Sequence, residues 1–241
     1  MTKFGRLKGD KPAPKSRLGK WWRKAQKNVF VAFFVDLLTI LGSALVLSLL
    51  LKTFLIRSFF IPSGSMLNTL QIDDRIIVNE LVPNVVPIER GDVVVFKDPG
   101  GWLGPITPKK TNFIVAAGEF VLSAFGFVAP DSDQHLVKRV IGVGGDHVVC
   151  CDASGKLQIN GQSITEPYLA KGTNPSDVKF DVTVPAGTIW VMGDNRGNSE
   201  DSRFHSDLPG KGFVASKYVV GRAFVVSWPS SHWKWLDNYP D

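Results

Sequence analysis

The sequence is poor in the residues that build metal centres and histidine-based catalytic sites. Among 241 residues there are only four histidines and two cysteines. None of the histidines has the spacing of a metal site or of a Ser-His-Asp triad. We therefore expect each to be a surface or strand-end residue: His135, His147, His205 and His232. No metal or cofactor is predicted.

The two cysteines, Cys150 and Cys151, are adjacent in a strand-like run. Neighbouring side chains of a strand point to opposite faces, and Cα atoms joined by a trans peptide lie closer than a disulfide normally requires. The sequence therefore predicts two half-buried packing thiols, without a disulfide framework.

The chain also lacks a basic folded part, although its net charge is +6. Residues 1–28 hold ten Lys and Arg and one acid, which leaves 18 basic and 21 acidic residues in the rest of the chain. A nucleic-acid-binding protein needs a basic face on its folded part. This charge distribution excludes nucleic acid as the expected partner and makes 1–28 a basic, disordered tail.

Charge is absent from "LLTILGSALVLSLLL", residues 37–51, and apolar residues continue on both sides. With these flanks the run is long enough to cross a bilayer, so we expect a transmembrane anchor over 29–55. A buried helix of a soluble protein and a cleaved signal peptide are alternatives, but bulky residues follow the run where cleavage would need small ones. The basic residues before it predict a single-pass protein of the cell membrane with a cytoplasmic N-terminus.

Residues 56–241 have the pattern of an extracytoplasmic β domain. Short runs of β-branched residues are separated by turn signals, and Asn160-Gly161 predicts a two-residue hairpin. We predict a mainly β fold: an antiparallel β-sheet catalytic module with a smaller β lobe at about 146–190, preceded by a single transmembrane helix. The seven predicted strand regions are 74–81, 91–98, 135–143, 147–152, 157–164, 188–194 and 219–228.

The β pattern is interrupted at about 100–134, which we interpret as an insertion. It contains the apolar stretch "NFIVAAGEFVLSAFGFVA". A second membrane crossing is the alternative, but this stretch is short and contains Glu119.

Two serines lie on a predicted turn, "FFIPSGSMLNTL", shortly after the anchor. Ser63 and Ser65 are ordinary turn formers, and a serine often caps a helix. A serine is also a candidate nucleophile if a base lies nearby.

Lys138 is the candidate base, because a lysine serves when burial lowers its pKa from about 10.4 towards 7. In the strand "HLVKRVIGV" it shares a face with Leu136 and Val140, while Arg139 points to the other face and stays protonated. These residues equally fit a lysine that reaches solvent along an ordinary strand.

The stretch "GDNRGNSEDSRF", residues 193–204, is rich in Asp, Asn, Ser and Arg. It predicts a loop held by side-chain to backbone hydrogen bonds and by Arg–carboxylate pairs. A calcium loop is less compatible, because Arg196 occupies a position where an oxygen ligand would be needed.

Four stretches, in this order after the anchor, resemble the bacterial type I signal peptidases, which are membrane-anchored serine proteases with a Ser/Lys pair. They are "IPSGSMLNTLQIDDRIIV", "RGDVVVFK", "VKRVIGVGGDHV" and "VMGDNRGNSEDSRF". The resemblance implies that Ser65 is the nucleophile and Lys138 its general base. Ser63 and the backbone N–H of Ser65 would form the oxyanion hole, and Ser199 would orient the lysine amine.

The same resemblance implies a supporting role for five residues of the 193–204 loop: Gly193, Asp194, Arg196, Asp201 and Arg203. Its implied substrates are exported preproteins with small residues at the first and third positions before the cut. We expect a monomer whose partners are these preproteins and the lipid bilayer. A non-catalytic, membrane-anchored binding module is the alternative function; a soluble, self-cleaving Ser/Lys regulator fits poorly with an anchor.

Overall fold

The computed structural model describes residues 29–104 and 134–239, and of residues 29 and 49–54 only the backbone. The chain divides into two compact units, 1–50 and 51–241, which are treated separately below. The predicted tail, 1–28, and most of the predicted insertion lie outside the described residues.

The apolar run forms one long helix, α2 (Val29–Phe54). Its segment Phe30–Ser48 is long and apolar enough to cross a membrane, and none of that segment is buried within the protein. A helix that is apolar all round and uncovered by protein is suited to lipid. This agrees with the predicted anchor.

The second unit is built on an antiparallel eight-stranded sheet with the order β1-β2-β11-β3-β4-β9-β10, in which β12 also pairs with β11. The strands are β1 (Ile56–Phe60), β2 (Arg75–Asn79), β3 (Val93–Lys97), β4 (His135–Val143), β9 (Thr188–Met192), β10 (Val214–Ala215), β11 (Val219–Trp228) and β12 (Lys234–Trp235). Short 3-10 helices follow or connect them, and the described residues include η2 (Arg196–Asn198), η3 (Ser202–Phe204), η4 (Ser216–Tyr218) and η5 (Ser230–His232).

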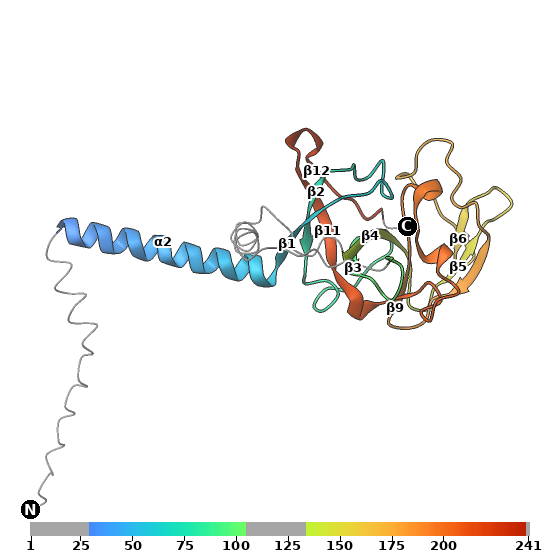
Figure 1. Ribbon diagram of the computed structural model, residues 1–241, viewed down its shortest axis with the longest axis horizontal. Coiled ribbons are helices and arrows are strands. Elements are labelled where there is room, and N and C mark those ends of the chain that lie inside the picture. Colours follow the sequence, from blue (N-terminus) through green and yellow to red (C-terminus); the bar gives the residue numbers. More distant parts are fainter. Residues whose placement is uncertain (1–28, 105–133, 240–241) are drawn as a thin grey trace, which may run out of the picture. The chain divides into compact units, whose positions relative to one another are not determined.

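A smaller four-stranded sheet has the order β7-β6-β5-β8. Its strands are β5 (His147–Cys150), β6 (Leu157–Ile159), β7 (Gln162–Ser163) and β8 (Phe180–Thr183). Within the second unit, β5 and β6 lie at one end and β1, β2 and β12 at the other (Figure 1). The Asn160-Gly161 hairpin is confirmed: it joins β6 to β7, and both residues have the positive φ that this turn requires.

The central strands of the large sheet are covered on both faces. In β3, Val93 and Val95 belong to one apolar cluster, whereas Val94 and Phe96 belong to another. Successive strand residues point to opposite faces, so a strand buried on both sides is a continuous apolar run, as "VVVF" is. β4 lies next to β3 and is buried almost throughout, which brings Lys138 and Arg139 into the interior.

The predicted mainly antiparallel β fold is confirmed, and every predicted strand region contains a strand. The prediction for the cysteines is wrong, because a disulfide joins Cys150 to Cys151. It assumed a regular trans strand with opposed side chains, but β5 ends at Cys150 and the peptide bond between the two residues is cis.

Candidate active site

The turn that carries both serines is anchored by apolar residues on each side. Ile61 and Met66 are buried, whereas Ser63 is exposed and Ser65 half-buried. Hydrogen bonds of the turn close it after the serines: the N–H of Leu67 donates to the carbonyl of Gly64 (3.2 Å). The buried flanks hold the turn at the protein surface and leave its hydroxyl groups accessible.

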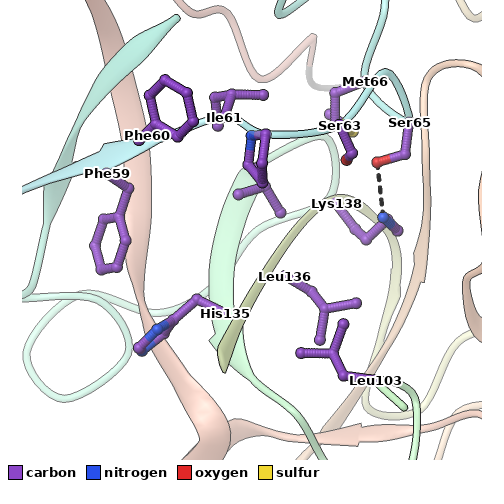
Figure 2. Close-up of a pocket in the computed structure, with 12 residues that line it drawn as sticks. Phe59, Phe60, Ile61, Ser63, Ser65, Met66, Leu103, His135, Leu136 and Lys138 are labelled. Carbon is purple, nitrogen blue, oxygen red and sulfur yellow. Dashed lines mark hydrogen bonds between the residues drawn. The ribbon is translucent and has the colours of Figure 1, made fainter. Parts of the chain in front are cut away.

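Lys138 reaches this turn from β4, 73 residues away in sequence. Its Nζ lies 2.9 Å from Oγ of Ser65, a hydrogen-bond distance. Only 4% of Lys138 is exposed. In Figure 2 the lysine side chain ends beside Ser65, and Ser63 lies next to it on the turn. The structure therefore brings together a hydroxyl and a buried amine that the sequence separates widely.

Burial has a direct effect on the charge of this amine. Burial has the largest influence on the pKa of Lys138, which is lowered to about 8. The positive charge of Arg203 also lowers this pKa, whereas the carboxylates of Asp201 and Asp194 raise it. A fraction of about one tenth of the lysine is then neutral at pH 7 and able to accept a proton. The solvent-reaching lysine that the sequence left open is not what the structure contains.

Ser63, Ser65 and Lys138 line a cleft of about 280 Å³. Its remaining walls are mainly apolar: Phe59, Phe60, Ile61, Pro62, Met66, Leu103, His135, Leu136 and Val137. Figure 2 shows the aromatic residues of β1 at one end of this cleft and the Ser65–Lys138 contact at the other. The dimensions and the apolar lining suit an extended peptide with small side chains.

The loop after β9 holds the serine turn in place through hydrogen bonds from Asn195. The backbone N–H of Asn195 donates to the carbonyl of Ser65 (3.0 Å), and its side-chain amide donates to the carbonyl of Gly64 (2.9 Å). An added Cβ on Gly193 would lie 2.2 Å from Oγ of Ser199 and 2.5 Å from the carbonyl oxygen of Ser65. Only glycine allows this close approach.

Two Arg–carboxylate pairs fix the loop, as the sequence predicts. Arg203 binds Asp201 through two hydrogen bonds of 2.8 Å, and Asp201 also accepts from the N–H of Gly193 (2.9 Å). Arg196 donates to the carbonyl of Gly193 (2.9 Å) and pairs with Glu166 of the neighbouring segment. Bidentate pairs of this kind fix geometry as well as charge.

A third pair was missed by the sequence analysis. Arg139 donates to both carboxylate oxygens of Asp194 (2.9 and 2.7 Å), and both side chains are fully buried. Thr69 donates to the same carboxylate, and the ring of Tyr168 covers the guanidinium at 4.1 Å. The pair ties β4, the β9 loop and the serine turn together. The basic residue beside Lys138 and the acid-rich loop were visible in the sequence, but their pairing was not.

Two further expectations have different outcomes. No hydrogen bond joins Ser199 to Lys138 within the described ranges, where the buried Oγ of Ser199 has no partner, so its orienting role stays a prediction.

The prediction for His205 is wrong, because it is buried and stacks on Trp102 (4.3 Å between ring centroids). Its loop folds inward around Asp201, whose carbonyl lies 2.8 Å from Nδ1 of His205.

The chain is similar to proteins of one known family over most of its length. The family model for signal peptidase, peptidase S26, matches residues 34–228. Signal peptidase I of Mycobacterium tuberculosis is 40% identical over 210 residues, which cover 79% of this chain and 71% of that protein. Signal peptidase I of Leptolyngbya laminosa is 34% identical over 190 residues, covering 78% and 77%.

A probable signal peptidase I of Mycobacterium leprae is 40% identical over 208 residues, covering 75% of this chain and 71% of that protein. Among solved structures, a crystal structure of a signal peptidase I from Enterococcus faecalis is 26% identical and covers 56% of this chain and 95% of that chain, with a TM-score of 0.35. From the family match over most of its length and from relatives of up to 40% identity, the chain belongs to the signal peptidase family, peptidase S26, and is a peptidase.

Proposed function

We propose that Ser65 and Lys138 are the nucleophile and the general base with which this chain, a serine peptidase that removes signal peptides, cuts its substrates. One observation carries the proposal: a buried lysine amine with a pKa of about 8 lies 2.9 Å from a serine hydroxyl in a peptide-sized cleft. A non-catalytic binding module has no use for a buried lysine with a lowered pKa, because burying its ammonium weakens the fold.

The geometry supports a two-step acyl transfer. Neutral Lys138 takes the proton of the Ser65 hydroxyl as Oγ attacks the carbonyl carbon before the cut. The protonated amine then gives that proton to the leaving nitrogen, the peptide C–N bond breaks, and an ester with Ser65 remains. Lys138, neutral again, takes a proton from water as the water oxygen attacks the ester. The amine then gives this proton to Oγ of Ser65 as the ester bond breaks, so the cut peptide leaves as a carboxylic acid and both residues return to their starting state.

We assign the oxyanion hole to the hydroxyl of Ser63 and the backbone N–H of Ser65. Both belong to the turn that enters the cleft (Figure 2), so both can face a carbonyl oxygen whose carbon is within reach of Oγ of Ser65. Removing one such donor costs about 10²–10³-fold in rate in other serine proteases. Gly193, Asp194, Arg196, Asp201 and Arg203 retain the proposed supporting role, and Ser199 that of orienting the lysine amine.

The edge of β4 supports substrate binding as an added strand. His135–Lys138 pair with β3 on one side, whereas β9 pairs only from Arg139 onward. Among the described strands, none pairs with the second edge of Leu136–Lys138. A peptide placed there would hydrogen-bond along β4 and end with its carbonyl at Ser65. We propose preproteins with small residues at the first and third positions before the cut, because bulky side chains crowd this part of the cleft.

Helix α2 and the family assignment indicate membrane anchoring. We propose that the protein is a monomer that crosses the bilayer once, with residues 1–28 in the cytoplasm, the anchor over 29–55 and residues 56–241 as the extracytoplasmic peptidase domain. We also propose that residues from about 100 to 134 form an insertion in this domain and that residues from about 146 to 190 form its smaller β lobe. The charge asymmetry around the helix supports the orientation.

The test of this function is cleavage of a preprotein by the purified full chain in detergent. We expect two products, and mass spectrometry of the larger one should place the cut after a small residue at the end of the signal peptide. A matched preprotein in which the small residues at the first and third positions are replaced by Phe should remain intact. Binding of the preprotein without cleavage would instead support the binding module.

The pH profile gives a separate prediction. Lys138 acts only when neutral and its pKa is lowered to about 8, so kcat/KM should be low below that pH and rise through it. Between pH 7 and pH 9 the expected increase is about tenfold. The measurement is the initial rate of peptide cleavage at low substrate concentration over pH 6–10, on enzyme shown to stay folded throughout. A flat profile would mean that another group is the base.

A further inference from the structure

The cleft extends over both faces of β4. Val137 packs against the cluster that contains Ile61 and Met66, whereas Leu136 packs in a different cluster with Leu103. Figure 2 shows Leu136 beside Leu103 below the strand and Ile61 above it. A peptide strand lying along the edge of β4 would meet both faces, because its side chains point alternately to one and the other.

Leu103 comes from the start of the predicted insertion and is held in place by a capped turn. The carboxylate of Asp98 accepts from the N–H groups of Gly100 (2.9 Å), Trp102 (3.0 Å) and Leu103 (3.1 Å). Three backbone donors on one carboxylate leave the turn little freedom. Leu103 is therefore a built part of the cleft wall.

Trp102 fastens the same turn to the body of the domain. Its ring stacks on His205 with an interplanar angle of 7°, and it meets Phe96 edge to face at 5.7 Å. His205 follows the loop that contains Asp201 and lies close to the carbonyl of that residue. The stacking of Trp102 on His205 therefore connects the turn that carries Leu103 with the loop after β9.

We propose that Leu103 and Leu136 form a binding site for the side chain of the second residue before the cut, and that this site favours an apolar side chain. The inference rests on the proposed function. The first and third side chains of an extended substrate point to the same face of β4. We place them on the face where Ile61 and Met66 are buried, because close packing there suits small side chains. The second side chain then points to the opposite face, where Leu136 and the half-buried Leu103 line the cleft with apolar surface.

The test uses the full chain in detergent and three peptides with Ala at the first and third positions and Leu, Ser or Asp at the second. We expect the wild-type kcat/KM to be about tenfold higher for Leu than for Asp, the usual size of an apolar pocket's preference. Leu103→Ala should reduce this ratio to about threefold or less, because it removes apolar contact area. Leu103→Met should preserve the ratio, because its side chain has a similar volume.

Leu169→Ala is the matched control, since Leu169 is also half-buried but lies outside the cleft. It should keep the wild-type ratio. Equal wild-type rates for the three peptides would overturn this inference and leave the peptidase function intact, and so would an unchanged ratio in a folded Leu103→Ala protein. Failure of the wild type to cut any of the three peptides or a preprotein would instead count against the proposed function.

Discussion

Replacing Lys138 with methionine should abolish cleavage while leaving the protein folded. Without the amine no group is in place to take the proton from Ser65, and the serine hydroxyl is a weak nucleophile by itself. We expect kcat/KM to fall by about 10⁴-fold or more, and Ser65→Ala to have an equally large effect. The measurement is cleavage of a preprotein over long incubation, with the product detected by mass spectrometry.

Stability distinguishes loss of chemistry from loss of fold. At pH 7 the buried ammonium destabilises the native state by about 3 kcal/mol, the equivalent of lowering its pKa from 10.5 to about 8. Lys138→Met removes that cost, so its unfolding temperature should equal or exceed that of the wild type. Cleavage by either the Ser65 or the Lys138 variant at a rate near that of the wild type would refute the assignment. The double variant should be no worse than either single one, since both residues serve one proton transfer.

Replacing Asp194 with alanine should strongly destabilise the folded domain. It would leave the guanidinium of Arg139 fully buried without its carboxylate, and it would remove the acceptor of Thr69. Breaking a buried ion pair in this way costs about 3–5 kcal/mol. For a domain of this size the thermal unfolding temperature should fall by about 10 °C. The measurement is thermal unfolding in detergent, followed by circular dichroism.

Asp177→Ala is the control, because Asp177 is exposed and its carboxylate accepts a hydrogen bond from the exposed side chain of Asn174 (3.2 Å). Its unfolding temperature should be that of the wild type. Arg139→Met combined with Asp194→Ala should be more stable than Asp194→Ala alone, since the unpaired charge is then gone. If the double variant loses the sum of the two single losses, the two side chains do not act as a pair.

The large sheet was predictable wherever the chain has a run rich in β-branched residues. β4 and β11 were predicted with their observed limits, because each is a long run of this kind bounded by turn residues. β1 was missed. Its residues, "IRSFF", include a charge and two aromatic residues but only one β-branched residue, so they do not have the pattern used to predict the other strands. They become a strand through pairing with β2, a tertiary contact that no local pattern contains.

At the site, the sequence allowed the reactive side chains to be predicted, but not the side chains that pack and pair around them. Ser65 and Lys138 were recognisable because their flanking motifs are specific, and the structure places the two side chains in contact. The Asp194 partner of Arg139 and the contribution of Leu103 depend on how the β9 loop and the 98–104 turn fold back against β4. Such long-range packing is decided by the whole fold and leaves no spacing pattern in the chain.

The two neighbouring cations of β4 have a genetic consequence. Lys138 must be stripped of water and left without a close counterion, whereas Arg139 must be neutralised by a carboxylate, and each requirement belongs to one face of the strand. A one-residue deletion or insertion inside β4 ahead of Lys138 would exchange their faces and ruin both arrangements at once. We therefore expect a single-codon deletion or insertion in that part of the gene to abolish both cleavage and the buried ion pair.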